Sequence, residues 1–275
     1  RIWGRYRRSR KTEGGELSWY IFWKKKIDIF TTTAFENSKS VHMLTPSKLG
    51  LFEECQRCFW LENNKKLKRP QAMFSSLPNA LDRMLKKRFD SFRQKGIMPP
   101  ELSTIENAKL FDNLQLLEKW RNNFRGLLVF DDEGNGLKGA FDEVLMIDSC
   151  LVPLDFKSRG SPPKDETIEF YRSKLSLYNL LLHGDGHLVK DYAYLLFYFL
   201  VEENHSIKFN AQLVKVKTNI ADAERLLEKA IAILNGPEPK HNPNCAFCCW
   251  SLGLPPKKKG MGVYDLSGEN GGLSQ

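Results

Sequence analysis

The sequence predicts an α/β fold in which a mixed central β-sheet is flanked by helices and closed near the C-terminus by a cysteine-metal site. Three observations lead to this class. Two strands with alternating apolar residues follow one another within residues 139–159, and apolar residues recur with helical spacing on both sides of them. Two C-x-x-C pairs, at 55–58 and 245–248, lie far apart in the chain. Such pairs can meet at one metal and join distant segments.

The charge of the chain is unevenly distributed. Its 275 residues have an ordinary globular composition, with 27% charged and 41% hydrophobic residues, and a net charge of +9. Residues 1–42 hold ten Lys and Arg against four Asp and Glu, which leaves 32 against 29 in residues 43–275. The basic balance is therefore weak support for a nucleic-acid-binding domain. No apolar run reaches membrane-spanning length, so we expect a cytoplasmic protein without a membrane partner.

The composition also predicts three segments. We expect residues 1–42 to be a basic leader that is disordered or not native, because they lack periodicity and precede Met43, the first methionine. A basic arm that binds nucleic acid is the alternative for this leader. Residues 43–256 should form the folded domain. Residues 257–275 are rich in Gly, Ser and Lys, which is typical of a flexible tail.

Helical patterns precede the central strands. Thr45 followed by Pro46 is a typical helix start, with a hydroxyl cap and proline at the first helical position, and predicts a helix to about residue 62. Apolar residues at helical spacing predict a second helix over 76–94 and a third over about 105–123.

Strand and turn patterns then alternate with two more helices. A strand at 126–130 is followed by D-E-G-N-G at 132–136, a strong hairpin signal. The two strands within 139–159 are joined by a short turn at 148–150. The remaining patterns predict, in order, a helix over 167–183, strands over 191–202 and 207–217, and a helix over 222–234.

The second strand of the central pair carries the candidate chemistry. Residues 151–157 alternate, so that the apolar side chains share one face while Asp155 and Lys157 share the other. A hairpin can bring Asp142 close to Asp155. Two carboxylates and a lysine suit a hard divalent cation, Mg²⁺ or Mn²⁺, which can activate water and stabilise a phosphoryl transition state. The alternative is a solvated strand face with an ordinary ion pair.

With these residues the chain resembles the PD-(D/E)XK nuclease superfamily, above all its RecB-type branch, which includes the iron–sulfur exonucleases of CRISPR adaptation. The motifs are G-x-x-D at 139–142 and D-x-K at 155–157. The resemblance implies a restriction-endonuclease-like core over 43–256, with Asp142 and Asp155 as metal ligands and Lys157 orienting or activating the attacking water. It also implies DNA as substrate, with a possible partner protein in a repair or defence complex.

The chain departs from this family at two places. The family's next helix carries Q-x-x-x-Y, and here Tyr178 is in place but Lys174 stands where glutamine is expected. We expect both to support the site or the substrate backbone. The family often adds a His or Glu on an earlier helix, where Asp82 is the candidate substitute ligand for Mg²⁺, unless it is a plain helix acid. Arg159 and Lys164, around the next loop, are candidates for contacting nucleic acid.

The cysteines suggest a second metal. Cys55, Cys58, Cys245 and Cys248 can place four thiolates around one centre, and both Zn²⁺ and a [4Fe–4S] cluster accept such a set. The resemblance favours the iron–sulfur cluster. In the resembling exonucleases one early and three late cysteines hold it, which makes Cys249 an alternative ligand.

The leading interpretation is a Mg²⁺-dependent nuclease that hydrolyses DNA phosphodiester bonds. The missing histidine and the lysine in place of glutamine support an alternative, a catalytically inactive nucleic-acid-binding or scaffolding module on the same fold. A third interpretation makes the cysteines primary, in a redox or iron-sensing protein.

Overall fold

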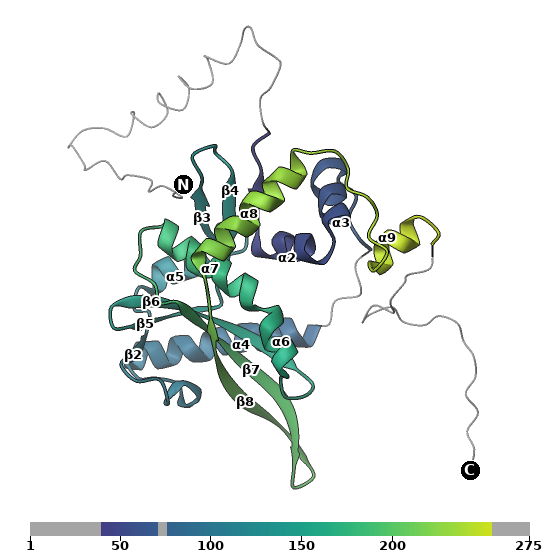
Figure 1. Ribbon diagram of the computed structural model, residues 1–275. Coiled ribbons are helices and arrows are strands. Elements are labelled where there is room, and N and C mark those ends of the chain that lie inside the picture. The colour runs from purple at the N-terminus through teal and green to yellow at the C-terminus, as the bar shows by residue number, and fades with distance from the viewer. Residues whose placement is uncertain (1–39, 71–75, 255–275) are drawn as a thin grey trace, which may run out of the picture.

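The structure is a computed structural model that describes residues 40–70 and 76–254. It contains two sheets with helices packed around them, which confirms the predicted α/β class (Figure 1). The smaller sheet has the strand order β1 (Met43–Leu44), β4 (Gly136–Gly139), β3 (Leu127–Phe130). The larger sheet has the order β2 (Ala108–Leu110), β5 (Glu143–Ile147), β6 (Cys150–Arg159), β7 (Tyr192–Glu203), β8 (Ser206–Lys217).

The predicted central hairpin is formed by β5 and β6. Asp148 and Ser149 make its two-residue turn with φ of 47° and 64°, the positive values that a tight hairpin turn of this kind requires. On its other side β6 pairs in parallel with β7, so it is an inner strand of the sheet. Gly139 ends β4 rather than beginning this hairpin, and Asp142 lies directly before β5.

Each face of the larger sheet has its own hydrophobic core. On one face α4 (Ser76–Lys95) packs through Leu85 and Phe89, beside the short 3-10 helix η2 (Pro100–Leu102). The other face is covered by a larger core to which α7 (Arg172–Gly184) and α8 (Ile220–Leu234) contribute. Because β6 lies between two packed faces, a charged side chain on it needs a partner nearby.

The first predicted helix is divided into three. Thr45 caps α2 (Pro46–Glu54) as expected, its Oγ1 accepting the Lys48 amide at 3.2 Å. The helix then breaks at Cys55, whose backbone is extended with φ of −159°, and resumes as α3 (Gln56–Trp60) and the π-helix η1 (Leu61–Lys65). The break turns the Cys55 side chain towards the C-terminal segment.

Two other helix predictions need correction. Residues 105–123 were predicted as one helix but contain the edge strand β2 and then α5 (Leu114–Arg121). The helix begins only after Asn113, whose side chain caps it by accepting the Leu116 amide at 3.0 Å. Residues 167–183 form α6 (Asp165–Phe170) and α7, which meet at Tyr171. The predicted helices over 76–94 and 222–234 and the strands over 126–130, 191–202 and 207–217 are confirmed to within a few residues.

The last described helix, α9 (Ala246–Ser251), lies beside α3, so the C-terminal part of the described chain contacts its N-terminal part (Figure 1). Most of the predicted leader and all of the predicted tail fall on residues 1–39 and 255–275, outside the described residues, and stay predictions. In the part of the chain that the structure describes, no helix has the length and apolarity needed to cross a bilayer.

Candidate active site and cysteine centre

Asp142 and Asp155 meet across the β5–β6 hairpin. Glu143 pairs with Leu154, so continuing the antiparallel register places Asp142 opposite Asp155. The Oδ2 atom of Asp142 accepts the backbone N–H of Phe156 at 3.0 Å. The Asp155 side chain is only 2% exposed, whereas that of Asp142 is 23% exposed. The two predicted acids therefore share one partly buried place.

Two lysines hold the Asp155 carboxylate. Lys157 Nζ contacts Oδ2, and Lys174 Nζ, from α7, lies 3.0 Å from Oδ1. The Lys174 ammonium also lies 5.3 Å from the centre of the Tyr178 ring. The structure thus brings together all five predicted catalytic residues, and Lys174 makes a direct contact from the position where glutamine was expected.

Asp82 reaches this cluster through a lysine that the sequence analysis did not single out. Lys86 Nζ lies 2.8 Å from Asp82 Oδ2 and 3.1 Å from Asp142 Oδ1. Among the described residues, Asp82, Asp142 and Asp155 do not form a compact set of three ligands. The signal available in the sequence was the i, i+4 spacing of Asp82 and Lys86, which places both on one side of α4.

Burial and charge shift the pKa values of these groups in opposite directions. Burial alone would raise the pKa of Asp142, but the ammonium groups of Lys86, Lys157 and Lys174 outweigh it and lower the pKa. Burial and the neighbouring charge of Lys174 lower the pKa of Lys157 to about 7. A lysine with this pKa exists partly as the neutral amine near neutral pH, so it can accept a proton.

A buried network of ion pairs holds the β5–β6 hairpin through Glu143. The fully buried Glu143 accepts hydrogen bonds from Arg93 Nη2 at 2.6 Å and from Arg121 Nη2 at 2.9 Å. Arg121 also bonds both oxygens of Asp90, at 2.9 and 2.8 Å. This network was not predicted from the sequence. A glutamate within an apolar strand is a usable signal for it, because a buried acid needs partners.

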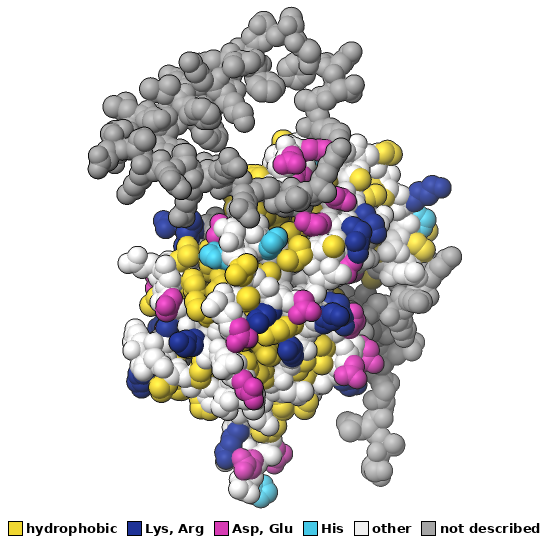
Figure 2. All heavy atoms as spheres, turned by 60° about the vertical axis from the view of Figure 1, so that its left-hand side comes forward, with side chains coloured by type: hydrophobic (Ala, Val, Ile, Leu, Met, Phe, Trp, Pro, Cys, Tyr) yellow, Lys and Arg dark blue, Asp and Glu magenta, His cyan; other side chains and the backbone are white. Residues whose placement is uncertain are grey.

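The two predicted nucleic-acid contacts, Arg159 and Lys164, lie at the end of β6 and directly before α6 (Asp165–Phe170). Arg159 Nε bonds the Ser161 carbonyl at 3.4 Å, and Lys164 is an exposed residue directly before α6. On the face drawn in Figure 2, basic and acidic side chains are interspersed. Where Figure 2 draws this face in colour, the Lys and Arg side chains are not gathered into one continuous surface.

A cavity of ≈ 550 Å³ lies away from the acid cluster. It is lined by Ser173 and Ser176 of α7, whereas Lys174 and Tyr178 of the same helix turn to Asp155. Residues two positions apart on a helix point in different directions. None of the predicted catalytic residues lines this cavity.

The acid cluster has the donor chemistry of a divalent cation site. Asp142 and Asp155 offer carboxylate oxygens, the hard ligands that Mg²⁺ and Mn²⁺ prefer. The donor set of these two acids therefore fits a hard cation. Lys86, Lys157 and Lys174 also approach these oxygens, so a cation bound there would compete with ammonium groups.

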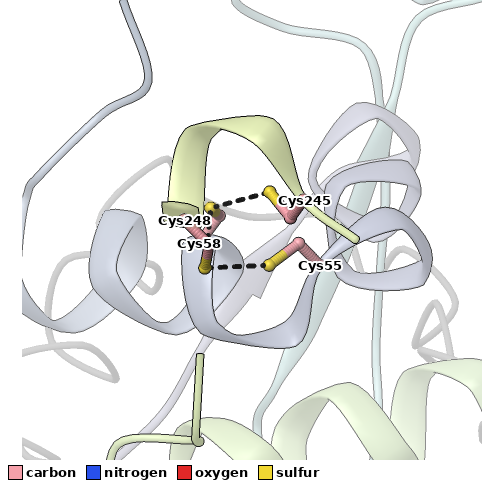
Figure 3. Close-up of side chains that lie close together, drawn as sticks. All are labelled: Cys55, Cys58, Cys245 and Cys248. Atoms are coloured by element: carbon pink, nitrogen blue, oxygen red, sulfur yellow. Dashed lines mark hydrogen bonds between the residues drawn. The ribbon is translucent and has the colours of Figure 1, made fainter. Parts of the chain in front are cut away.

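The four predicted cysteines form a second, separate centre. Cys55, Cys58, Cys245 and Cys248 are all buried, and their sulfur atoms lie within 4.8 Å of one another. Figure 3 shows the four side chains converging from the N-terminal ends of α3 and α9. Cys55 and Cys245 each occupy the residue before a helix, with the second cysteine of the pair in its first turn. Such a set suits Zn²⁺ or a [4Fe–4S] cluster.

Positive charge accompanies the sulfur atoms, and Cys249 is excluded from them. Arg69 Nη2 donates to Cys245 Sγ at 3.2 Å. The hydrogen bond from Cys58 lowers the pKa of the Cys55 thiol, despite its burial. Cys249 Sγ instead points to the Pro243 carbonyl at 3.5 Å, so the alternative ligand set that includes it does not match the structure.

The mixed sheets flanked by helices form an α/β protein of the kind seen in nuclease-like cores. The chain belongs to the PD-(D/E)XK nuclease superfamily, whose family model matches residues 43–251. Members are generally nucleases that use divalent metals. Among solved structures the chain is similar to the crystal structure of SSO0001, with 16% identity over 89% of this chain and 99% of that chain and a TM-score of 0.38. No curated protein matched the chain.

Proposed function

We propose that this protein is a metal-dependent nuclease that hydrolyses phosphodiester bonds in DNA. The observation that carries the proposal is the meeting of Asp142, Asp155 and Lys157 on one hairpin, in a chain of a nuclease superfamily. Asp155 is buried and contacts two lysines. Both observations argue against a solvated strand face with an ordinary ion pair, because an exposed carboxylate would not require two cationic partners.

Each residue of the cluster has a chemical role in this proposal. Asp142 and Asp155 would hold Mg²⁺ or Mn²⁺, with the Phe156 carbonyl as a further oxygen ligand. When bound, the cation supplies a more acidic water and positive charge for the phosphate. Lys157 would orient the attacking water and accept its proton, while Lys174 and Tyr178 would fix Asp155 and contact the substrate backbone.

We propose that DNA contacts the protein mainly beside the acid cluster rather than over a wide basic surface. Residues 43–275 carry 32 basic against 29 acidic side chains, so the domain itself has little general attraction for phosphate. Arg159 and Lys164 would contact the strand beside the site. Weak overall attraction also favours a partner protein, in a cytoplasmic repair or defence complex of the kind served by the RecB-type branch.

For the cysteine centre we propose a [4Fe–4S] cluster, with Zn²⁺ as the alternative. The support is the buried two-plus-two thiolate set together with the resemblance to iron–sulfur exonucleases. Anaerobic purification followed by metal analysis and visible spectroscopy distinguishes the two. Iron with a broad visible absorption that bleaches on reduction supports the cluster, whereas a colourless protein with one zinc per chain overturns it.

The nuclease proposal is tested by cleavage of linear and circular DNA, single- and double-stranded, with Mg²⁺, Mn²⁺ or a chelator. The variant is Asp155→Asn. The matched control is Asp148→Asn, at an acid 54% exposed in the hairpin turn of the same two strands. We expect metal-dependent cleavage by the parent and the control and a loss of at least about a hundredfold in the variant.

Absence of cleavage by the parent, with the cysteine centre loaded, would contradict the proposal and favour an inactive nucleic-acid-binding or scaffolding module. One specific observation supports that second candidate. Lys86 and Lys174 already form ion pairs with Asp142 and Asp155. A binding module would retain DNA affinity in Asp155→Asn.

A further inference from the structure

Lys86 is the group that faces Asp142 from the helix on the opposite side of the site. Its ammonium lies 3.1 Å from Asp142 Oδ1, and the other oxygen of that carboxylate accepts the Phe156 amide. The Lys86 side chain is 22% exposed, so the contact is largely shielded from solvent. Shielding strengthens an ion pair relative to one at the surface.

The same ammonium has a second partner on its own helix. Asp82 lies one turn earlier on α4, with Oδ2 at 2.8 Å from Lys86 Nζ, and its side chain is 37% exposed. Burial alone would lower the pKa of Lys86, but Asp142 and Asp82 outweigh it and raise the pKa. Lys86 Nζ thus lies between two carboxylates, at ion-pair distance from each.

The position of this ammonium conflicts with a divalent ion on Asp142. A cation that uses Asp142 Oδ1 needs the place now taken by Lys86, because both approach the same oxygen and repel each other. If a metal displaces Lys86 from Asp142, the Lys86 ammonium can remain paired with Asp82, because the two residues lie one turn apart on the same face of α4.

We propose that Lys86 is a built-in counter-ion of Asp142 that competes with the divalent cation, and that Asp82 retains Lys86 rather than binding the metal. This inference rests on the proposed metal site. It goes beyond that proposal because it assigns Lys86 control of metal affinity and removes Asp82 from the ligand set. A carboxylate that is free only a fraction of the time binds metal more weakly by that fraction.

The test compares Lys86→Met with Lys87→Met in the holo-protein with its cysteine metal in place. Lys87 is the next residue of α4 and is exposed, so its replacement removes the same charge without touching Asp142. Binding of Mn²⁺ is followed by the electron paramagnetic resonance of the free ion. We expect Lys86→Met to bind about tenfold more tightly than the parent and Lys87→Met to bind within about twofold of it.

Thermal unfolding gives a readout independent of activity. Without divalent metal, Lys86→Met should unfold at a lower temperature than Lys87→Met, because Asp142 loses its partner. Saturating Mn²⁺ should then raise the unfolding temperature more in Lys86→Met than in the parent.

The outcomes separate this inference from the proposed function. If parent and Lys86→Met bind Mn²⁺ equally, Lys86 does not compete and the inference is overturned while the metal site stands. If none of the proteins binds Mn²⁺, both are overturned. Asp82→Asn decides the assignment of Asp82: binding that is unchanged or weaker by up to about threefold agrees with a retaining role, and any larger loss counts against that role.

Discussion

Arg121 reaches the backbone of Asp142 from the buried side of the hairpin, its Nε donating to the Asp142 carbonyl at 3.0 Å. The same guanidinium bonds Glu143 through Nη2 at 2.9 Å. One arginine thus connects the candidate metal ligand to the buried acid next to it. The location of the Asp142 carboxylate therefore depends on an ion network that does not itself face the site.

The first prediction concerns this network. Replacing Arg121 by Met should lower the free energy of unfolding by about 3–5 kcal/mol, because Glu143 would remain buried with one partner fewer. Urea denaturation measures the loss. The control is Arg225→Met, which breaks an exposed ion pair with Asp222 and should cost less than about 1 kcal/mol. Equal losses in the two variants would contradict a structural role for the network.

The second prediction concerns the protonation of Lys157. Its pKa of about 7 lies below the ordinary value of 10.5, so the neutral amine should form as the pH rises through 7. In protein free of divalent metal, an amine-specific reagent should label Lys157 with a rate that rises to half its limit near pH 7, measured by mass spectrometry of peptides.

Lys174 provides the internal comparison for this experiment. Burial would lower its pKa, but Tyr178 and Asp142 outweigh burial and raise it above the ordinary value. Lys174 should therefore label only at much higher pH. Parallel labelling of the two lysines would show that Lys157 is not selectively deprotonated.

The third prediction uses two adjacent cysteines. Cys248→Ser should lose most of the bound metal and unfold at a lower temperature, because Cys248 Sγ lies 3.6 Å from Cys55 Sγ within the centre. Cys249→Ser should keep the metal, because its sulfur faces backbone carbonyls. Elemental analysis and thermal unfolding of the two purified variants decide the matter, and metal loss in Cys249→Ser would count against the two-plus-two set.

The fourth prediction compares two glycines. Gly126 has φ of +57°, and an added Cβ would come 2.5 Å from the Gly139 carbonyl oxygen, so Gly126→Ala should destabilise the fold by about 1–3 kcal/mol. Gly50 lies inside α2 with nothing within 4 Å of such a Cβ, so Gly50→Ala should stabilise by about 0.5–1 kcal/mol. Chemical denaturation of both variants tests the opposite signs.

The sequence predicted the central hairpin and the cysteine pairs because both depend on short spacings. The alternation before Asp155 and the turn at Asp148 are local, and each C-x-x-C pair occupies one helix start. The residues around Asp142 could not be found in this way. Lys86 and Arg121 lie on helices far from Asp142 in the chain, and only packing brings them to it.

The predicted helix boundaries were wrong where the backbone conformation depends on contacts with residues that are distant in the chain. Cys55 has an extended backbone, and its Sγ lies 3.6 Å from the Sγ of Cys248, which is nearly two hundred residues away. The strand β2 was read as helix because its three residues gain their hydrogen bonds from β5, at the edge of the sheet. Propensity cannot show such a partner.

The cysteine centre has a consequence for the order of events during synthesis. Cys55 and Cys58 leave the ribosome early, whereas Cys245 and Cys248 follow β8 and α8 in the chain. The centre can be completed only after the remainder of the described fold has been translated. The meeting of the four cysteines is therefore a late event, and a nascent chain that ends before α9 would carry the whole acid cluster without Cys245 and Cys248.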